Sequence, residues 1–463
     1  MFAVASPPAL PVGAFGPMSS RVRPPVASAP PHLATRPILR VECDLPGART
    51  STLTRLLAAE IVASFGERVL VVRRPRGGER SSGASTRAHD GAHLATASPD
   101  LWPRFEGFDR VLVDDDRDLP GFVTTIRVTR GAGAGAGDLL GVPADSIQPD
   151  NDLGACRFAL SPEVLASADV ARSHLRAADR ENLARWARAV TGRLVGVALS
   201  GGGAWGFLHV VLVREIVRRG VPIDVVSGAS MGATVGAYFA ARGLAGLDRL
   251  VERAARGDLG RAALGAIVST RSIERLVRDD LGDVRLDDLS VRFCPIATDL
   301  TKGESVAFVR GSLARAVRAS CSAPGLWAPT IHGASRYVDG AVSNHLPARL
   351  LRRMGARLSL ASNCYPYDRG PGAPSRSRFA RLLSAVSPIA RLGDLARSGN
   401  LLLHRSGDHG GSHADVLFDV EPQDGPIAGA FRFSRAPRVI AWAEGHEELH
   451  RKADELAAAW RAS

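Results

Sequence analysis

The sequence predicts an α/β fold in which strands and helices alternate along most of its 463 residues. Three observations support this prediction. Short apolar runs, such as ILRVEC at 38–43 and RVLVVR at 68–73, have the length and composition of buried strands. The segments between such runs repeat apolar residues at helical spacing. Two glycine-rich loops, at 201–206 and 228–232, each join an apolar run to a helical segment.

The composition argues against several classes of protein. All but two of the 59 basic residues are Arg, and the net charge is +12, but no basic run alternates with aromatic residues, so we expect no nucleic-acid partner. The five cysteines are far apart and never form a CxxC pair, which fits a reducing compartment. The N-terminus has no pattern of a signal peptide, and no apolar run is long enough to span a membrane. We therefore expect a cytoplasmic protein.

The part of the chain before residue 191 is predicted to contain three regions. Residues 1–36 are rich in Pro and Ala and predict a disordered arm. Residues 37–154 predict an α/β module with strands at 38–43, 68–73 and 108–116 and a helix at 52–66. Residues 155–190 are helical by period and predict a connector to the next domain.

The module at 37–154 resembles a Rossmann or P-loop nucleotide-binding domain in its order of elements. A loop at 47–51 follows the first strand, and Asp114 lies at the end of the third strand. The loop sequence GARTS lacks the lysine that contacts the β and γ phosphates in a P-loop. We therefore predict a degenerate nucleotide-binding-like module that does not turn over ATP or GTP.

The first glycine loop, GGGAWG, has the spacing GxGxxG on Gly201, Gly203 and Gly206 and opens the helix FLHVVLVREIVRRG. Backbone N–H groups at such a helix N-terminus favour an anion. A dinucleotide-binding fold would also need an acid at the end of the second strand, whereas Asp224 stands at the start of the strand IDVVS. The loop is therefore predicted to hold a different anion.

The second glycine loop has the sequence GASMG and places Ser230 between Gly228 and Gly232. It lies between the strand IDVVS and the helix TVGAYFAARG, which is the context of a nucleophile elbow. A serine nucleophile needs backbone donors for the oxyanion, which the first glycine loop can supply, and a base. Downstream, Asp339 stands in a DGA segment with Gly340 and Ala341.

These three motifs, together with ATDLTKGESVAFVRGSLARAVRASCSAPG and VDGAVSNHLP, resemble the patatin-like phospholipases, and more closely their neuropathy target esterase branch. The resemblance is specific from about 180 to 365. It implies a three-layer α/β/α hydrolase domain at 191–368, which a basic helical segment, a strand and a C-terminal helix at 369–463 complete.

The resemblance also implies roles for individual residues. Ser230 would be the nucleophile and Asp339 the general base of a Ser-Asp dyad that cleaves lipid esters, such as those of lysophospholipids, without metal or cofactor. The oxyanion hole would be formed by the backbone of Gly201, Gly202, Gly203 and Ala204. Trp205 departs from the family, which has Arg or Lys there. Its indole either packs against an acyl chain or a membrane interface, or belongs to the core.

Other interpretations fit parts of the sequence. A Ser-His-Asp triad could use His345, His404, His409 or His413. The residues from His446 to His450 spell HExxH, a zinc-binding pattern, although an apolar seam there also predicts a docking helix. A lipid-binding scaffold with an inactive site is a further alternative. Residues 376–405 combine an apolar face with arginines that include Arg376, Arg378, Arg381, Arg391 and Arg397, which predicts either peripheral contact with an anionic membrane or a buried helix with a basic outer face.

Overall fold

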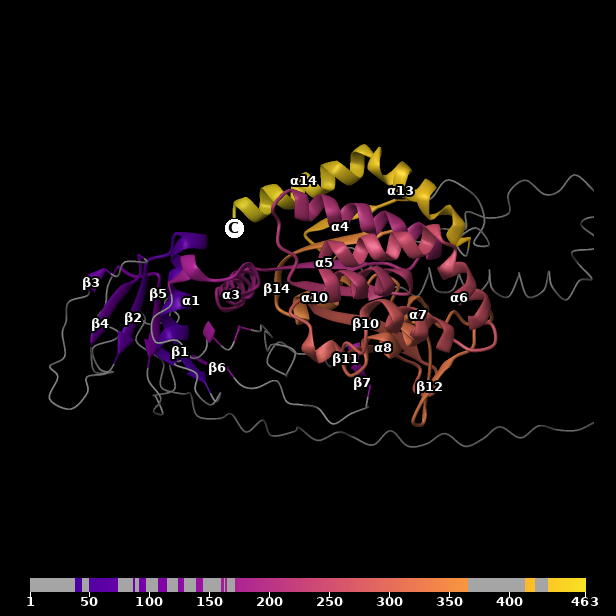
Figure 1. The fold of residues 1–463 in the computed structure, drawn as a ribbon, viewed down its shortest axis with the longest axis horizontal. Helices are drawn as coiled ribbons and strands as arrows, with labels where there is room; N and C mark the ends of the chain where they lie inside the picture. Colours follow the sequence, from indigo (N-terminus) through magenta and orange to yellow (C-terminus); the bar gives the residue numbers. More distant parts are fainter. Residues whose placement is uncertain are drawn as a thin grey trace, which may run out of the picture.

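The computed structural model contains two β-sheets, formed by successive parts of the chain (Figure 1). It describes residues 38–43, 50–73, 86–87, 91–96, 107–114, 124–128, 139–144, 160–161, 163–164, 171–364, 413–420 and 432–463. The arm at 1–36, most of the candidate phosphate loop and the basic segment at 376–405 therefore lie outside the described residues. Both sheets carry packed helices, so the predicted α/β class is confirmed.

The first sheet has the strand order β3-β4-β2-β5-β1-β6, and its pairs are parallel except β3 with β4. Strand β1 lies between β5 and β6, both of which come later in the chain. Such an order is expected when crossover connections join parallel strands. Its elements are β1 Ile38–Cys43, α1 Thr50–Phe65, β2 Val69–Arg73, β3 Thr86–Arg87, β4 His93–Thr96, β5 Arg110–Asp114 and β6 Thr124–Val128.

The helix α3 (Ala177–Val190) packs on this first sheet and shares its core. Leu183 and Trp186 of α3 are fully buried against Leu53 and Leu57 of α1. The region expected to be a connector is thus, over α3, part of the core of the first module. An apolar stripe on a helix must be buried against some partner, and here α1 supplies it.

The second sheet has the order β12-β13-β10-β9-β8-β14-β15, with β11 paired to β10 and β7 paired to β11. Strands β8, β9, β14 and β15 and the first part of β10 are parallel, whereas β11, β12 and β13 are antiparallel to their neighbours. The strands are β7 Leu140–Pro143, β8 Leu194–Leu199, β9 Val225–Ala229, β10 Arg292–Asp299, β11 Glu304–Arg310, β12 Thr330–His332, β13 Ser335–Asp339, β14 Ala356–Asn363 and β15 Val416–Asp419.

Strand β7 differs from the sequence-based division of the chain. Residues 140–143 were assigned to the first module, but they pair antiparallel with β11 at the edge of the second sheet. The periodicity of a short apolar run does not reveal which sheet it joins, because pairing is decided by contacts far away in sequence.

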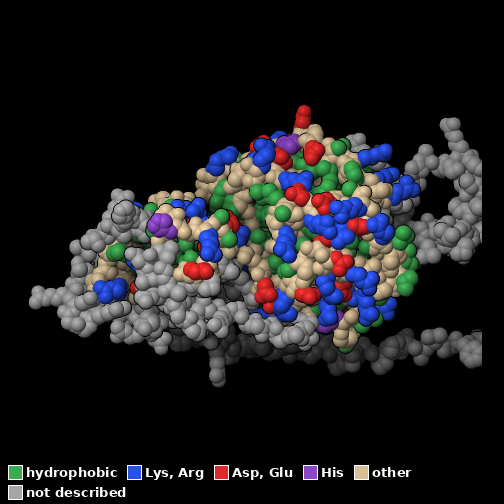
Figure 2. Space-filling view, viewed as in Figure 1, with side chains coloured by type: hydrophobic (Ala, Val, Ile, Leu, Met, Phe, Trp, Pro, Cys, Tyr) green, Lys and Arg blue, Asp and Glu red, His purple; other side chains and the backbone are tan. Residues whose placement is uncertain are grey.

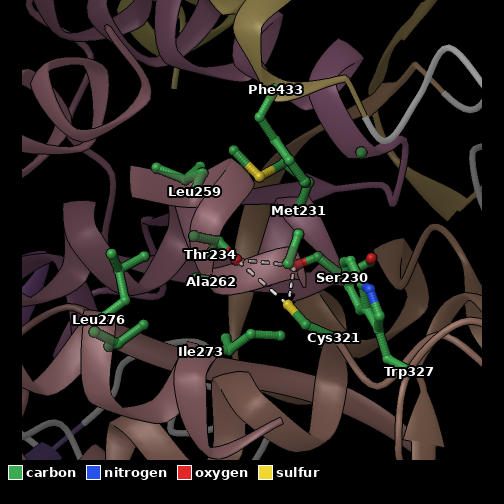
Figure 3. A pocket seen from close by; sticks show the side chains of 13 residues that line it. Ser230, Met231, Thr234, Leu259, Ala262, Ile273, Leu276, Cys321, Trp327 and Phe433 are labelled. Carbon is green, nitrogen blue, oxygen red and sulfur yellow. Dashed lines mark hydrogen bonds between the residues drawn. The ribbon is translucent and has the colours of Figure 1, made fainter. Parts of the chain in front are cut away.

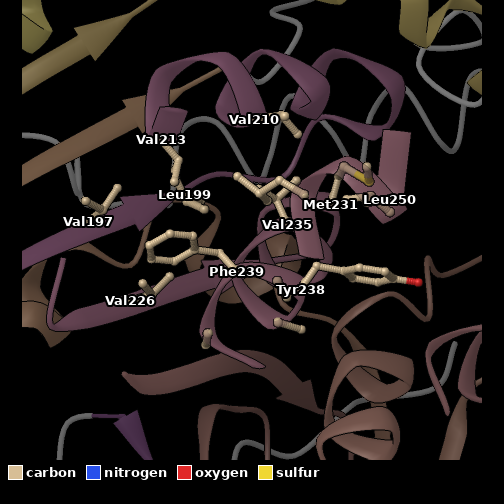
Figure 4. Packing of buried hydrophobic residues seen from close by; sticks show 14 of the residues in the cluster. Val197, Leu199, Val210, Val213, Val226, Met231, Val235, Tyr238, Phe239 and Leu250 are labelled. Carbon is tan, nitrogen blue, oxygen red and sulfur yellow. The ribbon is translucent and has the colours of Figure 1, made fainter. Parts of the chain in front are cut away.

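Helices cover both faces of the second sheet, as the predicted three-layer α/β/α arrangement requires. Val195, Val197 and Leu199 of β8 face the core formed with α4 and α5, while Leu194 and Ala198 face α10 (Figure 4). The C-terminal helices α13 and α14 lie over α4 (Figure 1). The helices are α4 Leu208–Arg218, α5 Met231–Ala255, α6 Asp258–Ala266, α7 Arg271–Leu281, α8 Leu313–Ser320, α9 Ala341–Asn344, α10 Ala348–Arg353, α13 Ala436–Glu444 and α14 Glu447–Arg461, with short 3-10 turns at Arg172–His174, Gly203–Phe207, Leu286–Asp288 and Phe433–Arg435.

No helix in the described ranges combines the length and the apolar composition needed to cross a bilayer. The longest of them, α5, is interrupted at Gly243, whose backbone is non-helical with φ of 60°.

A buried ion pair joins α3 to the second sheet. The carboxylate of Asp224, which is 1% exposed, accepts hydrogen bonds from Arg188 of α3 at 2.7 and 2.9 Å and from the backbone N–H of Val195 at 3.2 Å. In a dinucleotide-binding fold, Asp224 would bind a ribose. Here its carboxylate instead holds α3 to β8 and to the start of β9.

Replacing Asp224 by Ala should destabilise the protein by about 3–5 kcal/mol, because the buried guanidinium groups of Arg188 and Arg185 lose their buried carboxylate and keep only the exposed Glu181 as an acidic partner. Chemical denaturation of wild type and variant measures this difference. The matched control is Asp248→Ala, which breaks an exposed pair with Arg214 and should change stability by about 0–1 kcal/mol. Equal effects of the two substitutions would show that the buried pair is not a strong contact.

Candidate active site

Ser230 lies in a strained turn between β9 and α5. Its φ of 54° and ψ of −121° make it the single residue other than glycine with positive φ in the described part of the chain. Such a conformation costs of order 1–3 kcal/mol and persists only where the surroundings impose it. The turn therefore has the strained strand-to-helix geometry that a nucleophile elbow requires.

The flanking glycines are required by close approach of backbone segments. A Cβ on Gly228 would lie 2.6 Å from the backbone of Gly232, and a Cβ on Gly232 would lie 2.2 Å from the carbonyl oxygen of Leu199 in β8. Neither contact has room for a methyl group. The elbow is thus pressed against the strand that leads into the first glycine loop.

Residues around the end of α8 fix the backbone of Ser230. The N–H of Ser230 donates to the Ser320 hydroxyl at 3.0 Å. The thiol of Cys321 donates to the Ser230 carbonyl at 3.2 Å (Figure 3). The hydroxyl of Thr234 lies 3.4 Å from the same carbonyl oxygen. The bond from the N–H of Ser230 satisfies a donor that neither β9 nor α5 uses, whereas the Ser230 carbonyl also accepts the first helical hydrogen bond of α5, from the N–H of Thr234 at 3.1 Å.

Asp339 ends β13 and reaches Ser230. Its carboxylate is 5% exposed and accepts a hydrogen bond from the N–H of Ala341 at 2.8 Å. Burial raises the pKa of Asp339 to about 6, and the Ser230 side chain and the N–H of Ala341 partly oppose this shift because both favour the ionised carboxylate. Gly340 has no space for a side chain, since a Cβ there would lie 2.1 Å from the carbonyl oxygen of Ile296.

The glycine loop lies directly beside Ser230. A Cβ on Gly201 would lie 3.3 Å from the Cβ atoms of both Ser230 and Ala341. The N–H of Gly201 donates to the carbonyl of His345 at 3.2 Å, so this member of the expected donor set is already engaged. The N–H groups of Gly202, Gly203 and Ala204 have no acceptor among the described residues, as expected at the start of a helix.

Buried side chains of α4, of α5 and of the residue after β14 contact the glycine loop and the residue before it. Nε2 of His209 lies 3.1 Å from the carbonyl oxygen of Ser200, and Nδ1 lies 2.9 Å from the Ser362 hydroxyl. Burial lowers the pKa of His209 to about 4, so the ring is neutral at physiological pH and Nε2–H donates to the carbonyl. A Cβ on Gly202 would lie 2.7 Å from Sγ of Cys364, and one on Gly206 2.4 Å from Cγ of Met231.

An apolar pocket of about 530 Å³ opens beside Ser230 (Figure 3). Nearly all of its wall is hydrocarbon, contributed by the elbow, α6, α7, the loop after α8 and the turn before α13. The lining residues are Gly203, Ser230, Met231, Thr234, Leu259, Ala262, Ala263, Ile273, Leu276, Val277, Cys321, Trp327 and Phe433.

The alternative triad receives no support from the described residues. Among them, no histidine lines the pocket or hydrogen-bonds to Ser230 or Asp339. The carbonyl of His345 instead accepts from the glycine loop. Two other candidates, His404 and His409, lie outside the described residues, and His413 lies next to β15.

The HExxH segment does not form a convergent pair of imidazoles. His446 precedes the first residue of α14 and stacks on Trp442, with ring centroids 4.5 Å apart. His450 contacts Glu215 through Nδ1 and the carbonyl of Glu444 through Nε2. Within the described ranges, no group of three or more His, Cys, Asp or Glu side chains is placed to hold a metal ion.

Trp205 packs on the C-terminal helices. Its ring meets that of Trp442 edge to face at 6.3 Å, and the residue is partly buried against the main core. It is absent from the pocket wall, so the structure favours core packing over contact with a bound acyl chain.

Comparison with known proteins assigns the part of the chain that contains this site to a family of domains. Residues 197–352 match the family model of the patatin-like phospholipases. The chain contains a patatin-like phospholipase domain. It is 34% identical over 179 residues to the uncharacterized NTE family protein Rv2565 of Mycobacterium tuberculosis, a match that covers 38% of this chain and 31% of that protein. The match to Rv1063c of the same organism is 32% over 209 residues, 42% of this chain and 58% of the relative.

A further relative is the neuropathy target esterase sws of Drosophila melanogaster, 29% identical over 191 residues that cover 38% of this chain and 13% of that protein. The matches thus span from about an eighth to somewhat more than half of each relative. The resemblance to the patatin-like phospholipases, and to their neuropathy target esterase branch, is confirmed for this domain.

Several residues around the patatin-like site were not singled out from the sequence. Ser320 and Cys321 occur in the motif AVRASC, but nothing in that motif indicates that they bond to the backbone of Ser230. Thr298, whose hydroxyl donates to the Asp339 carbonyl at 3.0 Å, belongs to the ATDLT segment. All three residues lie in segments that resemble the family but carry no evident catalytic chemistry. Such segments are the sequence signal that could have pointed to residues supporting the site.

Replacing Asp339 by Asn should stabilise the protein relative to wild type at neutral pH but not in acid. The pKa is about 6 in the folded state and lower in the unfolded chain, so the folded state binds the proton more tightly and wild-type stability falls as pH rises through this window. The neutral amide avoids this loss, which is of order 2–3 kcal/mol above the folded pKa. Denaturation of both proteins at about pH 4 and pH 7.5 measures it. A stability difference that does not change with pH would contradict the raised pKa.

Proposed function

We propose that this protein is a serine acyl hydrolase that cleaves carboxylic esters of phospholipids or lysophospholipids through a Ser230–Asp339 dyad. The observation that carries the proposal is the placement of the glycine loop and the buried carboxylate of Asp339 beside Ser230, which itself lines an apolar pocket. The family match and the similarity to NTE family proteins support the lipid class of substrate.

In the proposed reaction, Oγ of Ser230 attacks the ester carbonyl while its proton passes to the carboxylate of Asp339. The oxyanion accepts hydrogen bonds from the free backbone N–H groups of Gly202, Gly203 and Ala204. As the tetrahedral intermediate collapses, the carbon–oxygen ester bond breaks and Asp339 returns the proton to the leaving alcohol. Water then attacks the acyl-enzyme with Asp339 again as base, which releases the fatty acid and restores Ser230.

The electrostatics of Asp339 suit this role. A general base works best when its pKa lies near the working pH, because it is then ionised and still takes up a proton readily. The buried Asp339, with a pKa of about 6, meets this condition without a histidine. Neutral His209 acts in this proposal by holding the glycine loop through the Ser200 carbonyl.

Ser230→Ala and Asp339→Asn should each lower kcat/KM for a soluble ester by more than about a thousandfold while the protein stays folded. In wild type, kcat/KM should rise with pH and level off above an apparent pKa of about 6, because only the ionised carboxylate accepts the serine proton. Hydrolysis by Asp339→Asn at most of the wild-type rate would exclude the dyad. A chelator serves as the control and should leave the rate unchanged.

The pocket beside Ser230 is proposed to hold one acyl chain, because its wall is formed by aliphatic and aromatic side chains. Ala262 and Ala263 present only methyl groups to it from α6. These positions keep open a volume that larger side chains would fill, and they are proposed to set the chain length that the enzyme accepts.

Ala262→Phe should lower kcat/KM for long-chain esters at least tenfold and leave short-chain esters within about twofold, since the added ring occupies space that only a long chain reaches. A series of esters of increasing chain length measures this. Ala458→Phe, on the exposed face of α14, is the matched control. A uniform loss across the series, or no loss, would show that the pocket does not hold the acyl chain.

A further inference from the structure

The helix α6 carries two apolar faces. Its inner face, with Leu259, Ala262 and Ala263, lines the pocket beside Ser230. Beyond this face, Leu264 is 69% exposed, and Ile267 and Val268, which follow the helix, are 60% and 86% exposed. Three large aliphatic side chains exposed within five residues form a concentration of apolar surface that soluble proteins seldom leave open without a use.

A second segment extends this surface on the other side of the pocket. Leu326 is 47% exposed and precedes Trp327, which lines the pocket. The N–H of Ala328 donates to the carbonyl of Ala266 at 3.0 Å, so this loop lies against the end of α6. We call Leu264, Ile267, Val268 and Leu326 the α6 patch. Figure 2 shows hydrophobic side chains at the end of the molecule where Figure 1 places α6.

Basic side chains lie next to the α6 patch at the surface, and the exposed acid of the following helix, Asp279, lies about two turns beyond Arg271. Arg271 and Arg275 are exposed on the following helix, one turn apart. The acids of this region, Asp258 and Glu274, are largely buried and paired, Asp258 with Arg253 and Arg261, and Glu274 with Arg278, Arg315 and Arg318. An apolar surface bordered by exposed arginines complements the hydrocarbon and anionic headgroups of a phospholipid membrane.

We propose that the α6 patch docks on the surface of an anionic phospholipid membrane, so that an acyl chain passes from the bilayer into the pocket along α6. The proposal rests on the proposed lipid hydrolase function. A membrane is favoured over a protein partner because the patch is continuous, through α6 and the Leu326–Trp327 loop, with a pocket wall suited to the same hydrocarbon. A chain held in a bilayer reaches Ser230 without crossing water only if the mouth of the pocket meets the membrane.

The test compares the full chain with the double variant Ile267→Ser and Val268→Ser in co-sedimentation with vesicles of phosphatidylcholine, with and without phosphatidylglycerol. Both residues lie outside the pocket wall, so turnover of a short soluble ester should stay at the wild-type level. Vesicle binding and turnover of vesicle lipid should fall at least tenfold, because two aliphatic side chains no longer enter the bilayer. Leu417→Ser, on β15 at the opposite edge of the sheet, is the matched control and should bind as wild type does.

Two further variants separate the parts of the proposal. Arg271→Gln combined with Arg275→Gln should weaken binding to vesicles with phosphatidylglycerol and leave binding to phosphatidylcholine alone unchanged. Ser230→Ala should bind vesicles as wild type does while it loses turnover. If wild type binds vesicles through the patch but hydrolyses no ester, the proposed function fails and the docking surface stands.

Three outcomes would overturn the docking surface. The first is unchanged vesicle binding by the double variant. The second is a loss of binding that comes with a lowered melting temperature and an equal loss of soluble-ester turnover, since the residues would then be core. The third is a change from dimer to monomer in sedimentation analysis with vesicle binding intact, which would make the patch an interface between copies of this chain.

Discussion

The site depends on the contact of backbone with backbone where three segments of the second sheet meet. The turn after β9 presses Gly232 against the carbonyls of Leu199 and Ser200, and the turn after β13 presses Gly340 against the carbonyl of Ile296. Because these segments touch without side chains between them, Ser230, Asp339 and the glycine loop come within reach of one another. Side-chain chemistry at this site is therefore a consequence of how closely the backbone packs.

The same packing explains how the strain at Ser230 is held. A positive φ at a residue other than glycine is unfavourable, and the local sequence of the elbow cannot compensate for it. The compensation comes from α8, which is distant in sequence but supplies hydrogen bonds to the N–H and carbonyl of Ser230 from Ser320 and Cys321. The cores on both faces of the sheet in turn fix the strands that define the turn.

The sequence could predict the features that depend on local patterns, but not those that depend on contacts between distant segments. The glycine loop, the elbow and the DGA segment are local patterns, each with its own physical reason, and their joining strands and helices follow from periodicity. The role of Asp224, the sheet joined by β7 and the packing of Trp205 on Trp442 depend on contacts with residues far along the chain. The HExxH segment shows that a local pattern can also mislead. Zinc binding by this motif needs both histidines on one helix, but α14 begins only after His446.

Two features of the site act together in the proposed chemistry. The pocket wall offers hydrocarbon to an acyl chain, and the burial of Asp339, which does not line the pocket, raises the pKa of its carboxyl group. An acyl chain that fills the pocket removes further water, which strengthens each remaining hydrogen bond to the ionised carboxylate and to the developing oxyanion. The N–H of Ala341 and the hydroxyl of Ser230 then become the main groups that keep Asp339 ionised. The proposed dyad needs no histidine near neutral pH, because burial brings the pKa of Asp339 to about 6 while Ser230 and the N–H of Ala341 favour its ionised form.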